Sequence, residues 1–126
     1  MFRCVLTATL VAATALPLAA QTSRPFPASA LRGALQVTQA PELELNGQPA
    51  RLSPGARIRG TNNMLQLSAS LTGQSLLVHY TLEPSGLVHE VWILTPDEAA
   101  RKPWPRTTAE AQRWEFSPAA QTWTRR

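Results

Sequence analysis

Apolar and polar residues alternate along residues 31–94, in short runs separated by Gly, Pro and Asn. This period of two predicts β-strands, and Asn46-Gly47 and Ser53-Pro54-Gly55 predict turns between them. Six or seven short strands within residues 31–94 predict an all-β fold. The expected architecture is a small OB- or SH3-like barrel of about six strands, with an open β-sandwich as the alternative. One short C-terminal helix and an irregular Trp-rich tail complete it.

The most apolar part of this region, residues 75–94, is predicted to form a β-hairpin. Glu83-Pro84-Ser85-Gly86 supplies the turn, because Pro presets its φ and Gly accepts a positive φ. With a four-residue loop, Val78 lies opposite Val91 and Tyr80 opposite His89 on a core face. His79 then lies opposite Glu90 on the outer face.

The chain changes character after this hairpin. Thr95-Pro96-Asp97-Glu98 predicts a helix start with a capping box, and Lys102-Pro103-Trp104-Pro105 ends that helix. Residues 102–126 are predicted to form a weakly ordered extension or a hairpin that brings Trp114 and Trp123 near one another. A short helix from Thr107 to Arg113 is an alternative for its first part. Because an isolated hairpin is marginal in water, we expect this extension to be loose or weakly docked.

The N-terminus has the pattern of a secretory signal peptide. Residues 1–20 contain Arg3, an apolar run and a small-residue site that predicts cleavage after Ala20. A retained membrane anchor is the rival interpretation, but the apolar run is short for a span. We therefore expect a periplasmic protein that does not span the membrane, with a flexible segment over 21–30 and the barrel domain over 31–101. Cys4, the only cysteine, lies inside the signal peptide.

Charge and composition narrow the classes of partner. Twelve Lys and Arg face eight Asp and Glu, for a formal net charge of +4. This mild basic balance permits contact with anionic envelope polymers or lipid head groups. Export argues against a nucleic-acid partner.

The sequence gives little support for a catalytic site or a metal-binding site. His79 and His89 are predicted to point to opposite faces of the hairpin, so they cannot share a metal ion. We expect His89 to pack beside Tyr80 and His79 to pair with Glu90 on the surface. No serine has a nucleophile-elbow motif around it, and no pair of acids is placed by a predicted cleft. The sequence therefore predicts a protein that is not an enzyme and has no cofactor or bound metal.

Two features are candidates for binding. Arg51, Arg57 and Arg59 flank the predicted Ser53-Pro54-Gly55 turn and suit anionic groups, although exposed strand faces are routinely charged. Trp114 and Trp123 suit a protein interface. The expected function is a non-catalytic protein-interaction or scaffolding module for an unknown envelope protein. The alternative is a binder of anionic envelope polymer or lipid head groups through the arginine-bearing hairpin.

The sequence also resembles a family of small exported bacterial proteins that are generally uncharacterised. The likeness rests on the runs 45–59, 73–74, 78–81 and 86–95, and it covers about residues 31–100. It implies a small β-barrel and carries no activity, ligand or catalytic residues. The Trp-rich tail departs from the family pattern, so any role of Trp114 and Trp123 is particular to this chain.

Overall fold

The structure is a computed structural model, and it describes residues 24–126. Predicted features of residues 1–23, including the signal peptide and its cleavage site, lie outside the described residues. Strands dominate the fold, which confirms the all-β prediction. The elements are β1 (Leu31–Gln39), β2 (Glu42–Leu45), β3 (Gln48–Arg59), β4 (Leu65–Gln66), the 3₁₀ turn η1 (Ser68–Leu71), β5 (Ser75–Leu82), β6 (Val88–Ile93), α1 (Pro96–Ala99), α2 (Thr108–Arg113), β7 (Trp114–Ser117) and β8 (Thr122–Arg125).

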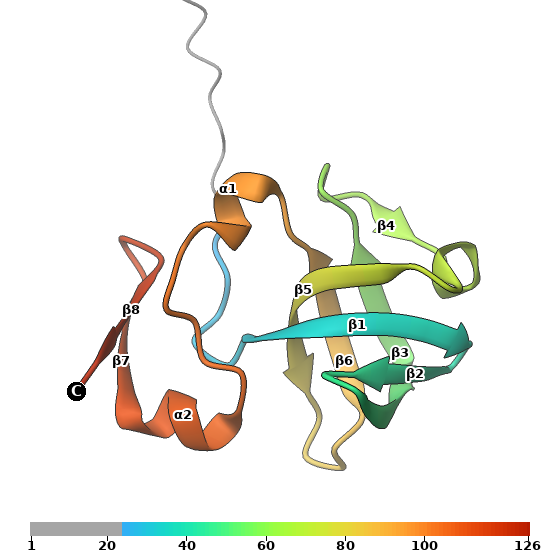
Figure 1. Cartoon of the computed structure of the whole chain (residues 1–126), viewed down its shortest axis with the longest axis horizontal. Helices are drawn as coiled ribbons and strands as arrows, with labels where there is room; N and C mark the ends of the chain where they lie inside the picture. The colour runs from blue at the N-terminus through green and yellow to red at the C-terminus, as the bar shows by residue number, and fades with distance from the viewer. Residues whose placement is uncertain (1–23) are drawn as a thin grey trace, which may run out of the picture.

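Six strands form one sheet in the order β2-β1-β5-β6-β3-β4, and an additional β2–β3 pairing closes a ring of hydrogen bonds (Figure 1). Every pairing is antiparallel except β3 with β6. The ring leaves β4, only two residues long, as a side strand on β3. This barrel-like arrangement resembles the five-stranded Greek-key barrel of OB folds more than a sandwich.

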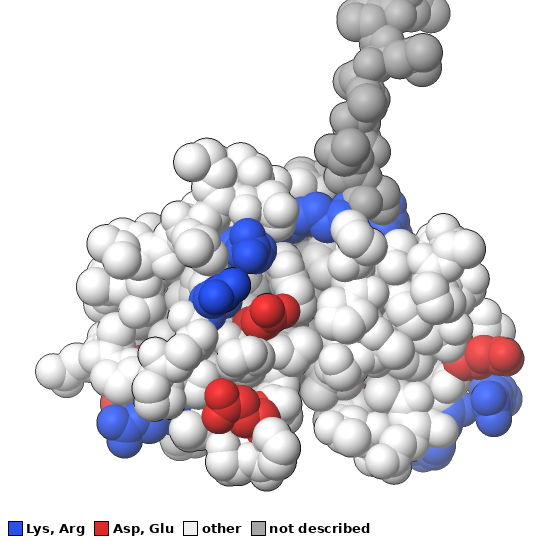
Figure 2. All heavy atoms as spheres, turned by 180° about the vertical axis from the view of Figure 1, so that it is seen from behind, with Lys and Arg blue, Asp and Glu red and all other residues white. Residues whose placement is uncertain are grey.

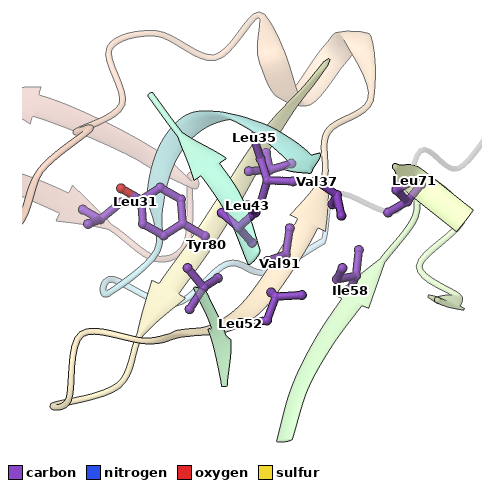
Figure 3. Packing of buried hydrophobic residues seen from close by; sticks show 11 residues of the cluster. Leu31, Leu35, Val37, Leu43, Leu52, Ile58, Leu71, Tyr80 and Val91 are labelled. Carbon is purple, nitrogen blue, oxygen red and sulfur yellow. The ribbon is translucent and has the colours of Figure 1, made fainter. Parts of the chain in front are cut away.

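The main core fills the inside of the ring (Figure 3). Its side chains come from alternate positions of the strands, as expected for a sheet with one apolar face. The Asn46-Gly47 turn that joins β2 to β3 has φ values of 53° and 77°, which confirms the predicted turn. The buried members are Leu31, Leu35, Val37, Leu43, Leu52, Ile58, Leu71, Val78, Tyr80, Val88 and Val91.

The β5–β6 hairpin has the predicted turn but a different register. Gly86 N–H donates to Glu83 O (2.8 Å), yet Tyr80 pairs with Val91 and not with His89. A bulge places both His89 and Glu90 opposite Thr81, and it turns Val88 into the core while His89 faces solvent. The predicted register and the predicted contact of His89 with Tyr80 are therefore wrong.

The Ser53-Pro54-Gly55 segment is not a reverse turn. It lies inside β3, which runs without interruption for 12 residues. The irregularity appears as a register shift between Leu52 and Arg57 in the pairing with β6. Pro and Gly here mark a distorted strand, which the sequence alone does not distinguish from a turn.

The C-terminal extension is a second, two-stranded sheet that packs against the main sheet. β7 and β8 pair as an antiparallel hairpin, and α2 precedes it, so the structure contains both alternatives offered for this part. Phe26, Ala30, Trp92, Trp104 and Trp123 are buried together. The sequence predicted a loose tail and a flexible segment up to residue 30, whereas in the described residues both parts contribute buried side chains to this cluster. The hairpin is marginal only when isolated, and Phe26 and Trp92 supply its missing partner.

Candidate functional site

Three consecutive residues, 104–106, connect the C-terminal extension to the main sheet and the segment before it through hydrogen bonds. Trp104 Nε1–H donates to Ala30 O (2.9 Å). Pro105 O accepts from Arg32 N–H of β1 (2.9 Å), and Arg106 O accepts from the Tyr80 hydroxyl of β5 (3.2 Å). These contacts fix the path of residues 104–106 across the sheet.

Aromatic rings fill the space between the outer side of the β5–β6 pair and the hairpin. Trp104 lies at the centre, stacked on His79 of β5 with ring centroids 4.0 Å apart. Phe26 meets His79 edge-on at 4.4 Å, and Trp123 and Phe116 of the hairpin contact Trp104 at 6.1 and 5.8 Å. Edge and offset contacts of this kind are the preferred geometries of aromatic pairs.

Arg32 is the buried cation under this cluster. Only 5% of its surface is exposed, and its Nε–H donates to His79 Nε2 (3.3 Å). Its remaining hydrogen bonds end on the main-chain oxygens of residues 98, 99 and 101, at 2.8 to 3.2 Å. Within residues 24–126, none of its hydrogen bonds ends on a carboxylate. The guanidinium also lies 5.6 Å from the Trp104 ring centroid.

The protonation state of His79 follows from these neighbours. Burial, followed by the charges of Arg32, Arg24 and Arg101, lowers the pKa of His79 to about 2. The imidazole is therefore neutral, and since Nε2 accepts from Arg32 the proton sits on Nδ1. Burial and the charge of the nearby Arg106 lower the pKa of Arg32, and the charge of Glu98 opposes them in part. The predicted surface pair of His79 with Glu90 is wrong, because His79 is 1% exposed.

A second arginine, Arg24, is largely buried and links the N-terminal segment to α1. Arg24 forms a bidentate ion pair with Glu98 and also donates to Gly60 O and Ile93 O. Glu98 completes the predicted capping box with Thr95, which the structure confirms. Burial alone would raise the pKa of Glu98, but hydrogen bonds from Arg24 and the Thr95 N–H lower it overall.

A groove of about 690 Å³ opens between the hairpin and the segment that follows α1. We call it the cationic groove. Trp104, Trp114 and Trp123 form its aromatic walls. Four cations line it, with Glu110 as the one carboxylate among the lining residues: Arg32, Lys102, Arg106 and Arg125. The Arg125 guanidinium lies 5.1 Å from the Trp114 ring centroid, so a cation and a ring already meet there.

The two sets of candidate binding residues predicted from the sequence lie in different surroundings in the structure. Trp114 and Trp123 line one groove together, although Trp114 pairs with Arg125 across the hairpin and Trp123 with Phe116. Arg51 and the pair Arg57 and Arg59 lie in one continuous strand and do not flank a turn. Arg51 contacts Glu42 (3.5 Å), Arg57 lies opposite Glu90, and Arg59 donates to Asn63 O (3.3 Å).

Sequence reasoning missed Arg32, Trp104, Arg106 and Arg125. The available clue was an arginine at the second position of an otherwise apolar strand start, Leu31-Arg32-Gly33, which points to a buried partner.

No group of three or more His, Cys, Asp or Glu side chains in residues 24–126 is placed to hold a metal ion. Over the same residues, the helices are too short to cross a membrane. No family model, curated protein or solved structure matches the chain.

Proposed function

We propose that the protein is a non-catalytic binding module that holds an anionic ligand in the cationic groove. The observation that carries this proposal is the imbalance of charge there: four cationic side chains and one carboxylate line a single groove. Arg32 contributes a buried charge that no carboxylate hydrogen-bonds within the described residues. A ligand anion would offset the excess of positive charge along this groove.

The remaining lining favours an anion that also carries a flat or apolar body. Lys102, Arg106 and Arg125 are exposed and can donate charge-assisted hydrogen bonds to a carboxylate or phosphate. Trp114, which is half-buried, offers a ring face for stacking or apolar contact. The volume is in the range of small-molecule sites. With the predicted export, the natural ligand belongs to the anionic polymers or lipids of the envelope.

The arginines of β3 give weaker support for such a site. Arg51 is paired with Glu42, and Arg57 lies opposite Glu90. Figure 2 shows a face on which the basic and acidic side chains lie interspersed, with mostly uncharged surface between them. An anion gains less at Arg51 and Arg57, because each already has an acidic neighbour.

Isothermal titration with naphthalene-2-carboxylate tests the proposal, and the neutral naphthalene-2-carboxamide is the control ligand. We expect the carboxylate alone to bind, more weakly at high salt. Arg106→Gln with Arg125→Gln should weaken binding by about tenfold or more, since two charge-assisted hydrogen bonds are lost. The charge-matched control, Arg57→Gln with Arg59→Gln, should stay within about twofold at fixed ionic strength. Equal losses in both double variants would show that net charge alone holds the ligand.

A second candidate function is protein interaction at β4, the free edge of the sheet. Met64, Leu65 and Leu67 are 66%, 62% and 78% exposed there, and exposed apolar side chains on an edge strand favour pairing with another chain. The adjoining hollow contains Ser53, whose buried hydroxyl has no hydrogen-bond partner among the described residues. An extended apolar segment of a partner protein fits this edge.

A photo-reactive phenylalanine at Gln66, in cells, tests that candidate. We expect one discrete cross-linked partner from position 66 and none from the control position Ser85 in the β5–β6 turn. The absence of any product at Gln66, or the same product at both positions, would reject docking at β4.

A further inference from the structure

We propose that the ligand is a single-chain anionic amphiphile, with its head group in the cationic groove and its acyl chain in a second hollow beside it. This inference rests on the proposed function and extends it. The second hollow, here called the apolar hollow, has a volume of about 570 Å³. Trp114 and Trp123 line both the cationic groove and the apolar hollow, so the same two rings border head and chain.

The two spaces differ sharply in chemistry. The cationic groove holds four cations, whereas no charged residue lines the apolar hollow. Its apolar walls come from four elements or their ends: Leu31 of β1, Leu82 of β5, Ala111 of α2 and Phe116 of β7. Leu82 is 42% exposed. An acyl chain in the hollow would cover that leucine.

An amphiphile matches this pair of spaces better than the simpler ligands do. A compact anion would satisfy Lys102, Arg106 and Arg125 but leave the apolar hollow empty. A neutral lipid would fill the hollow but make no charge-assisted hydrogen bond to the cations of the groove. The two spaces share the half-buried Trp114 as a lining residue, so the proposal requires the chain to pass this ring on its way from one space to the other. Fatty acids and lysophosphatidic acids share the required chemistry of one anionic head and one chain.

Chain-length dependence is the measurable consequence. Each methylene that enters the apolar hollow should strengthen binding by up to about fourfold. We would titrate the protein with saturated fatty acids of six, eight, ten and twelve carbons, below their micelle concentrations, and with the 1-alkanols of the same lengths. Fatty acids should bind more tightly with each methylene, and alcohols of equal length should bind at least about tenfold more weakly. A twelve-carbon lysophosphatidic acid compares a phosphate head with a carboxylate head.

Two leucines of β5 provide a matched pair of variants. Leu82 and Leu77 are 42% and 40% exposed, but only Leu82 lines the apolar hollow. Leu82→Gln should reduce the gain per methylene, whereas Leu77→Gln should preserve it. Arg106→Gln with Arg125→Gln should weaken all chain lengths by the same factor, because the head-group contacts do not depend on the chain.

The outcomes separate this inference from the proposed function. If naphthalene-2-carboxylate binds but affinity does not rise with chain length, or if Leu82→Gln behaves like Leu77→Gln, the amphiphile assignment is wrong and the anion site stands. If alcohols bind as tightly as fatty acids, the two spaces do not act as one site. If no anion binds, the proposed function fails as well. A preference for lysophosphatidic acid or for the fatty acid supports the inference and identifies the head group.

Discussion

His79 lies face to face with Trp104, with ring centroids 4.0 Å apart and ring planes inclined by 24°. One ring comes from the outer side of β5 and the other from the C-terminal extension. Because His79 is neutral and buried, the contact joins the two parts only while the imidazole stays unprotonated. The stability of the fold should therefore respond to pH through this residue.

We predict a loss of stability on mild acidification. The folded pKa of His79, about 2, lies below its ordinary value of 6.5, so the unfolded chain takes up a proton that the folded chain does not. This stabilisation is complete above about pH 6.5 and is lost as the pH falls, by up to about 1.4 kcal/mol per pH unit. Urea unfolding between pH 7 and 5 measures it. The slope should flatten in His79→Gln and persist in His89→Gln, and equal slopes in both variants would contradict the assignment.

The buried ion pair of Arg24 with Glu98 should matter far more than the exposed pair of Arg51 with Glu42. The side chains of Arg24 and Glu98 are 11% and 6% exposed, against 60% and 55% for Arg51 and Glu42. Glu98→Gln leaves the largely buried Arg24 without its counter-charge and should cost about 3 kcal/mol. Glu42→Gln should cost less than about 1 kcal/mol. Chemical denaturation of both variants compares them, and similar costs would argue against the ion pair as a fastening of the N-terminal segment.

The tryptophans of the extension should differ in their effect on stability. Trp104 is 5% exposed at the centre of the aromatic cluster, so Trp104→Ala should cost about 3 to 5 kcal/mol. Trp114 is half-buried at the groove, and Trp114→Ala should cost about 1 kcal/mol while weakening ligand binding. Thermal unfolding of the two variants measures this difference. Small and equal losses would mean that the extension is not packed on the barrel.

We expect Gln121 to be a second residue that holds the N-terminal segment in place, through hydrogen bonds to the main chain. Its Oε1 accepts from Phe26 N–H (2.8 Å), and its amide donates to Pro118 O (3.0 Å). Gln121→Ala leaves buried main-chain groups without partners and should cost about 1 to 3 kcal/mol. Gln112→Ala, an exposed glutamine of α2, should stay within about 0.5 kcal/mol. Urea unfolding compares the two, and indistinguishable values would count against this role.

The predictable parts of the fold are those fixed by local chemistry. The turn at Asn46-Gly47 was predictable because both residues accept a positive φ. The capping box of Thr95 and Glu98 was predictable because each side chain reaches the main-chain N–H of the other residue. The predicted β5–β6 register was wrong because the alternation of residue types does not reveal the bulge at His89 and Glu90.

The candidate site was predictable only in part, because long-range packing builds it. Trp114 and Trp123 were recognisable as binding residues by type. Their partners Arg32 and Trp104 are more than 70 residues apart in sequence, and hydrogen bonds of residues 104–106 bring them together. Periodicity along a strand carries no information about such contacts, which is also why His79 was expected at the surface.

The indole N–H region of a two-dimensional nitrogen–proton NMR spectrum tests the central claim most directly. The chain has four tryptophans, of which Trp104, Trp114 and Trp123 line the cationic groove and Trp92 does not. We predict four dispersed indole signals, and on titration with naphthalene-2-carboxylate the three groove signals should shift while that of Trp92 stays in place. Coincident indole signals at unfolded positions for Trp114 and Trp123, or a titration that leaves all four unchanged, would contradict a docked extension that forms an anion site.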